Sequence, residues 1–401
     1  MSASESTKSG AYGEFDARHP PSADRVADCV HCGFCLPTCP TYVLWGRETD
    51  SPRGRIHLIK MALDGEVPLD DSFRQHFDNC LGCMGCLSSC PSGVEYDALL
   101  EATRPQLERR SPASAPDRRF RRFILALFPY RGRLRWAAFF AWLAQKTGLQ
   151  AGLRAIGLFE RLPPRWRALE ALAPPVQLFK ALLGMPKPRR VDTPRARVAV
   201  LEGCVQSVFF PDVNRATLDV LAAEQIEVIP VPRQGCCGAL ENHAGADDEA
   251  RRKVRALIER FEGVQIDYVV VNAAGCGSAL KTADRLFAED DPFYPRAKAF
   301  TRKIKDALEL IFDLGPQALL RPLPARVAYH DACHLAHAQG IRHPPRALLA
   351  RIPELELVEI PDPDICCGSA GIYNLMQPEP ADALGRRKAN DVASMQPDIL
   401  A

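Results

Sequence analysis

Two cysteine runs with one shared spacing, near the start of the chain, constrain its fold more than any other feature. Each run has three cysteines at steps of three and a fourth after three further residues, directly before a proline. The runs are Cys29, Cys32, Cys35, Cys39 and Cys80, Cys83, Cys86, Cys90. This spacing is the ligand pattern of paired [4Fe-4S] clusters, in which the fourth cysteine of each run ligates the other cluster.

The pattern therefore predicts two ligand sets that exchange their last members. One set is Cys29, Cys32, Cys35 and Cys90, and the other is Cys80, Cys83, Cys86 and Cys39. The alternative is a pair of zinc sites, but zinc sites normally join two C-x-x-C units instead of using three cysteines at successive steps of three. Because iron-sulfur clusters exchange electrons, we expect the chain to transfer electrons.

The whole chain has the composition of a soluble globular protein of two or three domains, with 401 residues, 47% of them hydrophobic and 25% charged. It has fifteen cysteines, and we recognise no secretory leader. These features predict a cytoplasmic location, where thiols bind metal instead of forming disulfides. Residues 1–24 are polar and are expected to form a disordered tail. Residues 25–110 are expected to form a mostly helical domain with two [4Fe-4S] clusters, including a helix over residues 53–62.

The middle of the chain, residues 117–190, is strongly basic. It contains 16 Lys and Arg against 3 Asp and Glu, a net charge of +13 that leaves −11 for the rest of the chain. It also contains Trp136, Trp142 and Trp166, and its apolar runs are shorter than the ~20 residues needed to cross a bilayer. Two interpretations of this basic helical connector stay open. It forms an amphipathic surface for anionic lipid, or it packs against an acidic partner or the chain's own acidic domains. No nucleic-acid recognition motif accompanies the charge, so nucleic acid is not an expected partner.

Two copies of one α/β pattern follow, over residues 195–315 and 325–401. In each copy a short apolar strand leads to a cysteine, Cys204 or Cys333, and a vicinal pair before glycine follows 32 or 33 residues later. Short apolar strands that alternate with helices predict a parallel sheet in each copy. The predicted fold class is therefore α plus α/β, with an N-terminal ferredoxin domain and two C-terminal cysteine-rich modules.

The first module has four cysteines at the expected carboxyl ends of its strands, where open α/β sheets build their sites. They are Cys204, Cys236, Cys237 and Cys276. Three interpretations stay open for these thiols: a third iron-sulfur cluster, a zinc site, or a site without metal.

The second module has three cysteines, Cys333, Cys366 and Cys367. The repeat spacing would place a fourth roughly four to six residues beyond Ala401, so we expect a truncated module and an incomplete site. Three histidines, His330, His334 and His337, flank the site and are candidate replacement ligands.

Arg53 and Arg55 lie between the two cysteine runs. Cationic groups near a cluster stabilise its reduced state, although the same residues also fit the start of a surface helix. The sequence shows no paired carboxylates, nucleophile elbow, P-loop or dinucleotide fingerprint. We therefore expect no substrate-oxidising site in this chain, and oxidation of the organic substrate on a flavin in another subunit.

With these motifs assembled, the chain resembles the iron-sulfur subunit of glycolate oxidase, in the wider set that joins a helical ferredoxin domain to modules like those of heterodisulfide reductase. The resemblance rests on Cys-Val-His-Cys-Gly-Phe-Cys from Cys29, Asp-Ser-Pro-Arg-Gly-Arg-Ile from Asp50, Leu-Glu-Gly-Cys from Leu201, Gly-Cys-Cys-Gly-Ala from Gly235 and Cys-Cys-Gly-Ser-Ala-Gly from Cys366. In heterodisulfide reductase modules a second cysteine follows the counterpart of Cys276 after two residues. This chain has Ala279 there, which argues against the non-cubane cluster of that enzyme.

The resemblance implies an electron-transfer subunit of glycolate oxidase, also called glycolate dehydrogenase. Flavin-containing subunits would oxidise glycolate to glyoxylate, and this chain would pass the electrons towards an acceptor, expected to be membrane quinone. Peripheral contact with the inner membrane would accompany that role. Iron-sulfur subunits of anaerobic glycerol-3-phosphate dehydrogenase or heterodisulfide reductase are the nearest alternatives. A zinc-stabilised binding module is the alternative of a different class.

Overall fold

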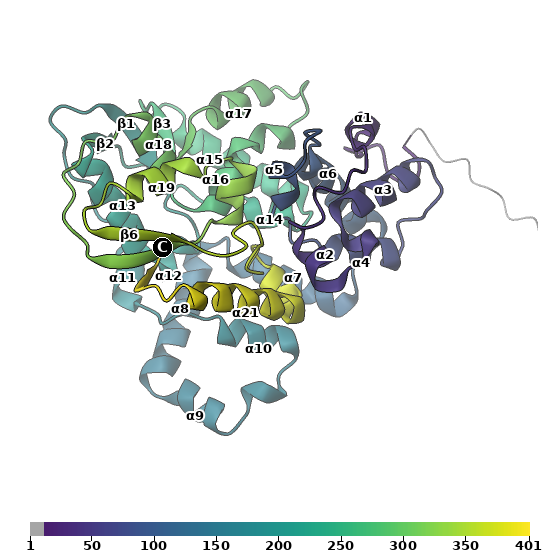
Figure 1. Cartoon of the computed structure of the whole chain (residues 1–401), viewed down its shortest axis with the longest axis horizontal. Coiled ribbons are helices and arrows are strands. Elements are labelled where there is room, and N and C mark those ends of the chain that lie inside the picture. The colour runs from purple at the N-terminus through teal and green to yellow at the C-terminus, as the bar shows by residue number, and fades with distance from the viewer. Residues whose placement is uncertain (1–11) are drawn as a thin grey trace, which may run out of the picture.

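The computed structural model describes residues 12–401. Figure 1 shows the N-terminal helices at one side, the two sheet-containing modules on the other, and the connector helices along the lower edge. The predicted fold class is confirmed: a helical dicluster-type domain is followed by two small parallel sheets flanked by helices.

The N-terminal domain consists of short helices around a core that includes Ile59, Phe73, Phe77 and Leu99. The helices are α1 (Ala23–Ala27), α2 (Pro40–Trp45), η1 (Glu48–Asp50), α3 (Pro52–Leu63), α4 (Asp71–Asp78), α5 (Gly85–Ser88) and α6 (Tyr96–Arg110). The predicted helix over 53–62 corresponds to α3. Its start is set by the Ser51 hydroxyl, which accepts a hydrogen bond from Gly54 N, and by Pro52 in the first turn.

The prediction of a disordered tail is wrong for residues 12–24, and residues 1–11 lie outside the described residues. Phe15 is buried in the N-terminal core, and Asp16 pairs with Arg109 at 2.8 Å between Oδ2 and Nε. Gln106 Nε2 donates to the carbonyl oxygens of Asp16 and Arg18 at 3.1 and 2.9 Å. The segment is polar overall, which favours disorder. The buried ring of Phe15 and the contacts with Gln106 and Arg109 on α6 hold it in place instead.

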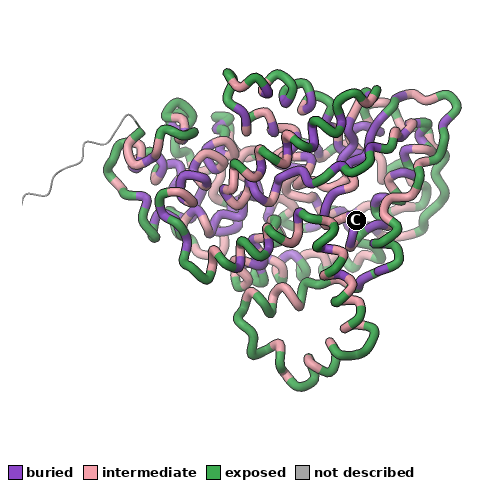
Figure 2. Tube along the Cα trace, turned by 180° about the vertical axis from the view of Figure 1, so that it is seen from behind, coloured by how far each residue is buried: buried purple, intermediate pink, exposed green. Residues whose placement is uncertain are grey.

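The middle of the connector forms the lower lobe of Figure 1, and its first and last helices lie against the rest of the protein. Its helices are α7 (Ala115–Leu127), α8 (Arg131–Lys146), α9 (Leu149–Ala155), η2 (Phe159–Arg161), α10 (Pro164–Ala171) and α11 (Leu178–Leu183). Neither α9 nor α10 contains a buried residue, and the tube in Figure 2 is correspondingly green and pink there. The lobe is attached through Phe120 and Ile124 on α7 and Leu134 and Ala138 on α8, which are all buried.

The two modules repeat one parallel pairing scheme. The first sheet has the order β2-β1-β3-β4, with β1 (Ala196–Val200), β2 (Ile226–Val228), β3 (Tyr268–Val271) and β4 (Ile304–Asp306). The second has the order β6-β5-β7, with β5 (Ala325–Tyr329), β6 (Leu355–Glu359) and β7 (Ile399–Leu400). Ala196 pairs with Ile226 as Ala325 pairs with Leu355, so the repeat seen in the sequence is also a repeat of register.

Helices cover both modules. Those of the first are α12 (Gln206–Phe209), α13 (Pro211–Ala223), α14 (Ala239–His243), α15 (Asp247–Phe261), α16 (Ala274–Lys281), η3 (Ala283–Leu286), α17 (Tyr294–Thr301) and α18 (Ala307–Asp313). Those of the second are a short π-helix, η4 (His334–Ala338), and α19 (His343–Leu349), α20 (Tyr373–Met376) and α21 (Pro378–Ser394).

Candidate iron-sulfur centres

The first three cysteines of the N-terminal run and the last cysteine of the other run line one cavity. Cys29, Cys32 and Cys35 lie in the loop after α1, and Cys90 follows α5. The empty space along these residues is about 410 Å³, including the part that is open to solvent. Gly33 shapes the loop, because its φ is 90° and an added Cβ would lie 2.9 Å from Arg53 Nη1.

A second cavity, of about 320 Å³, is lined by Cys39, Cys80, Cys83 and Cys86. Cys39 caps the start of α2, Cys80 and Cys83 follow α4, and Cys86 lies in α5. Cys86 also borders the first cavity, so the two cavities share a wall. The backbone thus brings together both exchanged sets that the spacing predicts.

The two cavities differ in exposure. Cys32 is exposed, and its neighbours Val30 and Phe34 are 67% and 65% exposed. Cys39, Cys80 and Cys83 are buried. The first cavity therefore lies at the protein surface, and the second lies inside it.

Burial dominates the ionisation of the cavity thiols. It raises the pKa of Cys35 to about 11 and the pKa of Cys83 and Cys86 well above the usual thiol value. Burial also acts on Cys80, but Arg55 and Arg104 outweigh it, and the pKa of Cys80 is lowered. Buried thiols of this kind become thiolates when a metal supplies the compensating positive charge, so the donor set fits a cationic iron centre.

Each predicted arginine contacts a different cavity. Arg53 donates from Nη1 to the carbonyl of His31, in the loop of the first cavity, at 2.9 Å. Arg55 lines the second cavity, is 1% exposed and donates to the His76 carbonyl at 2.6 Å. Its Nη2 lies 3.5 Å from Oδ1 of the fully buried Asp50. The interpretation of Arg53 and Arg55 as neighbours of the cysteine sites agrees with this geometry.

Two polar neighbours of the second cavity were not predicted from the sequence. The Tyr96 hydroxyl lies 3.5 Å from Cys80 Sγ, and the Thr41 hydroxyl lies 3.2 Å from Cys39 Sγ. Thr41 follows a predicted ligand by two positions, which is a weak signal. Tyr96 comes from a later helix, and no local pattern points to it.

In the first module the four predicted cysteines gather beyond the carboxyl ends of β1, β2 and β3. Cys204 and Cys236 sulfurs are 3.7 Å apart, and Cys237 and Cys276 sulfurs are 3.1 Å apart. The contact with Cys204 lowers the pKa of Cys236 and raises that of Cys204. The Cys236 thiol therefore ionises more readily than the Cys204 thiol beside it.

In the second module Cys333, Cys366 and Cys367 lie together, and the contacts among them raise the pKa of Cys366 and bring that of Cys367 to about 12. Of the three flanking histidines, His330 lies within hydrogen-bond reach of Cys367. The other two contact the N-terminal domain. His334 Nε2 lies 2.9 Å from the Gly82 carbonyl, and His337 Nδ1 lies 2.7 Å from the Ser88 hydroxyl. The expectation that His334 and His337 replace a missing ligand is therefore not supported by their contacts.

The second module meets the second cavity directly. Cys83 and Cys366 share one buried cluster with Leu81, Ile365 and Tyr373. The contact between a predicted ligand of the N-terminal domain and a cysteine of a module more than 280 residues away has no local sequence signal. It places Cys366 of the second module beside the buried cavity.

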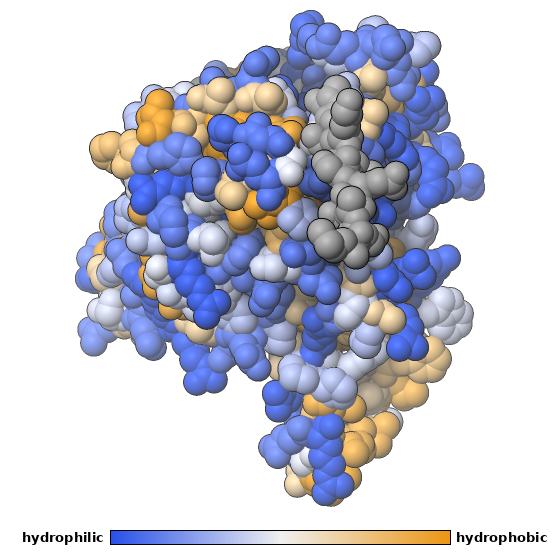
Figure 3. Space-filling view, turned by 90° about the vertical axis from the view of Figure 1, so that its right-hand side faces the viewer, coloured by the Kyte–Doolittle hydropathy of each residue, from blue (hydrophilic) through white to orange (hydrophobic). Residues whose placement is uncertain are grey.

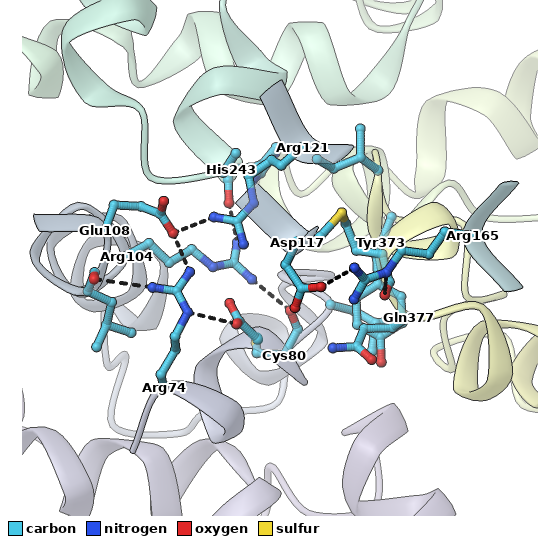
Figure 4. Close-up of a pocket in the computed structure, with 17 residues that line it drawn as sticks. Arg74, Cys80, Arg104, Glu108, Asp117, Arg121, Arg165, His243, Tyr373 and Gln377 are labelled. Atoms are coloured by element: carbon cyan, nitrogen blue, oxygen red, sulfur yellow. Dashed lines mark hydrogen bonds and ion pairs between the residues drawn. The ribbon is translucent and has the colours of Figure 1, made fainter. Parts of the chain in front are cut away.

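All four parts of the chain meet at a polar pocket shown in Figure 4. Arg104, on α6, donates to the carbonyl of Cys80 at 2.7 Å and to the carbonyl of His243 at 3.0 Å. Asp117 and Arg165, both on the connector, form an ion pair in the same pocket. Arg104 therefore connects the backbone at Cys80, a predicted ligand, with the backbone at His243 in the first module.

We expect the stability of the protein to depend on pH through Glu101, which lies on α6 and contacts the first module. Burial raises its pKa to about 7, and Asn242 of the first module donates to its Oε1 at 3.0 Å. A carboxyl whose pKa is raised in the folded state stabilises that state below about pH 4.5 and loses the effect as the pH rises to about 7. We expect stability to fall by about 2–3 kcal/mol across that window through this group. Glu101→Gln should remove this part of the pH dependence in thermal unfolding between pH 5 and 8. An unchanged slope in the variant would contradict the assignment.

Comparisons with known proteins match every part of this architecture. Residues 25–94 match the 4Fe-4S dicluster domain, and residues 198–281 and 327–401 match the cysteine-rich domain. Residues 116–173 match the linker region of the glycolate oxidase iron-sulfur subunit. Among the described residues, no helix has the length and apolar character needed to span a membrane.

Similar proteins cover most of the chain. The probable glycolate oxidase iron-sulfur subunit of Bacillus subtilis (strain 168) is 37% identical, over 88% of this chain and 81% of that protein. The glycolate oxidase iron-sulfur subunit of Escherichia coli (strain K12) is 34% identical, over 93% of this chain and 86% of that protein. One of the subunits of the fumarate reductase (CoM/CoB) of Methanothermobacter marburgensis is also 34% identical, over 52% of this chain and 40% of that protein. From the two full-length similarities and the linker match, the chain belongs to the family of glycolate oxidase iron-sulfur subunits.

Proposed function

We propose that the chain is the electron-transfer subunit of a glycolate-oxidising complex. The observation that carries the proposal is the pair of adjacent cavities, each lined by one of the two exchanged cysteine sets. In this assignment Cys29, Cys32, Cys35 and Cys90 hold one [4Fe-4S] cluster, and Cys80, Cys83, Cys86 and Cys39 hold the other. The clusters would supply one-electron transfer between a two-electron flavin and the next acceptor.

The exposure of the two cavities suggests a direction for the electrons. The apolar side chains of Val30 and Phe34 surround the exposed Cys32, and such a surface suits contact with a flavin-containing partner subunit. The buried second cavity lies beside Cys366 of the second module. We therefore assign entry to the Cys32 loop and exit to the second module. The cysteine sets of the two modules stay candidates for a further cluster.

Chemical analysis tests the proposed cofactors. Anaerobically purified protein should contain about eight iron atoms and about eight acid-labile sulfides from the two clusters, four of each per cluster. Zinc in their place would favour the zinc-stabilised binding module and would contradict electron transfer.

The connector surface supports the second part of the proposal, peripheral contact with anionic lipid. Trp136 and Phe140 on α8 are 67% and 62% exposed, and Phe179 and Leu183 on α11 are 73% and 80% exposed. Figure 3 also shows orange surface beside blue on the lower lobe. Part of the basic charge pairs with the chain's own acidic domains, through Arg131–Glu202 and Lys180–Asp212. Both interpretations of the connector thus have support, and the exposed aromatic residues favour lipid for its outer face.

We expect the protein to bind anionic vesicles more tightly than neutral ones, and more weakly as salt rises, because exposed charges are screened beyond ~10 Å at 0.1 M. The double variant Phe179→Ser with Leu183→Ser should weaken binding about tenfold or more, since each side chain contributes roughly 1.5–3 kcal/mol when buried. Leu319→Ser is the matched control, because Leu319 is 99% exposed and lies outside the connector. Vesicle sedimentation that gives equal binding for all three proteins would contradict lipid contact at α11.

A further inference from the structure

A large cavity beside a predicted redox site has no role in the function described so far. It lies between α10 of the connector and the second module, and it encloses about 1460 Å³ including its open mouth. Its lining comes from Cys367, Gly368 and Ser369, from α10 and from α21. We call this space the α10–α21 cavity.

The α10 part of the lining is held rigidly. Ala168 and Leu169 pack against the buried Phe120, Ile124 and Leu375. Arg165 pairs with Asp117 and donates from Nε to the Met376 carbonyl at 3.1 Å. Small residues on α10 and α21 keep the space open, since Ala168, Ala171 and Gly385 line it. The cavity is therefore a preformed feature of the connector and module together.

Its lining combines an apolar body with a few polar groups. Alanine, proline and glycine make up half of the lining residues, and Ser369, Asn374 and Arg167 supply hydrogen-bond donors. The lining also includes Glu379 and the ion pair of Arg386 with Asp382, at 2.8 Å. Leu172 lines the cavity and is 55% exposed, so an exposed apolar side chain of the connector borders the cavity. Such a site suits a planar ligand with an apolar body and carbonyl oxygens, able to reach it from a lipid surface.

We infer that the α10–α21 cavity binds the quinone that accepts electrons from this chain. The inference rests on the proposed function, which supplies the electrons from oxidation of glycolate to glyoxylate. Electrons would reach the cavity from the buried cluster that Cys83 shares with Cys366, through the adjacent Cys367, which lines the cavity. One quinone takes two electrons, delivered singly, and two protons from solvent at the open mouth to give one quinol. Arg167 stabilises negative charge on the ligand oxygens as they are reduced, whereas Arg386 is paired with Asp382.

Filling the cavity tests the inference in the complex reconstituted with its flavin subunit. Ala171→Phe places a ring at an exposed position of the lining, and Ala151→Phe makes the same change at an exposed position of α9 outside the cavity. With decylubiquinone as the probe, Ala171→Phe should raise the KM for quinone by about tenfold or more, with the control unchanged. Equal KM values in the two variants and the unsubstituted chain would overturn the inference.

A binding measurement separates this inference from the proposed function. Trp166 lies on α10, so bound decylubiquinone should quench its fluorescence, and the quenching should be lost in Trp166→Phe and weakened in Ala171→Phe. Glycolate-dependent reduction of the clusters, followed by EPR, should be the same in all variants. Equal quenching in Ala171→Phe and in the unsubstituted chain would overturn the cavity assignment and leave the proposed function intact. Slower cluster reduction in Ala171→Phe would instead mean that the cavity seats the flavin subunit, which also overturns it.

Discussion

Replacing Cys90 with serine is expected to remove the cluster of the first run and to leave the cluster of the second. Cys90 belongs by sequence to the second run, but it lines the cavity of Cys29, Cys32 and Cys35. Iron content should fall by about half, and electron transfer through the complex should fall by two orders of magnitude or more because the surface cluster is lost. EPR spectra of the dithionite-reduced variant should retain the signal of one cluster and lose the magnetic coupling between two.

The reciprocal variant makes this result decisive. Cys39→Ser should remove the other cluster, since Cys39 lines the cavity of Cys80, Cys83 and Cys86. Cys276→Ser is the matched control, because it removes a thiol of the first module and should leave both N-terminal clusters in place. If Cys90→Ser lost the cluster of Cys80, Cys83 and Cys86 instead, the exchanged ligand sets would be wrong.

The second large effect concerns Arg55. Its guanidinium is buried beside Asp50, which is 0% exposed, and beside Cys39 and Cys80. Burial opposes its charge, but Cys80, Tyr96, Cys39 and Asp50 outweigh burial and raise the pKa of Arg55 above its usual value. Arg55→Gln removes the positive charge and leaves the buried Asp50 carboxylate with His76 and Asn79 as its side-chain partners, at 3.0 and 3.1 Å. Loss of one partner of a buried ion pair costs about 3–5 kcal/mol of stability.

The same substitution should change the redox behaviour of the second cluster. Loss of a nearby positive charge destabilises the reduced, more negative state, so the midpoint potential of that cluster should become more negative. Lys60→Gln is the matched control on the same helix, because Lys60 forms only an exposed ion pair with Asp64. EPR-monitored redox titration and thermal unfolding measure both effects. An unchanged potential in folded Arg55→Gln would show that Arg55 does not act on the cluster.

The sequence predicts most of the fold because its signals are local. Pro52 and the amphipathic residues that follow it predict α3, and the apolar run before Cys204 predicts β1. The repeat from Ala325 predicts β5 in the same way. The exchange of Cys39 and Cys90 between cavities was also predictable, since their spacing reflects a fixed ligand geometry.

The remaining features depend on packing between distant segments. Phe15 lies in a polar stretch, and only the core of the N-terminal domain shows that it is buried. His334 and His337 are candidate ligands by sequence because they follow Cys333. The π-helix that carries them instead places His334 at the Gly82 carbonyl and His337 at Ser88 of α5. Likewise, no periodicity connects Cys83 with Cys366. Contacts of this kind follow from how domains dock, which local propensity does not encode.

The most direct test of the electron-transfer role combines this chain with its flavin-containing partner under anaerobic conditions and adds glycolate. EPR should then show reduced [4Fe-4S] clusters, and the signal should disappear when the eight cysteines of the two N-terminal runs are replaced by serine. Clusters that are present in full but stay oxidised after glycolate reduces the flavin would contradict the account.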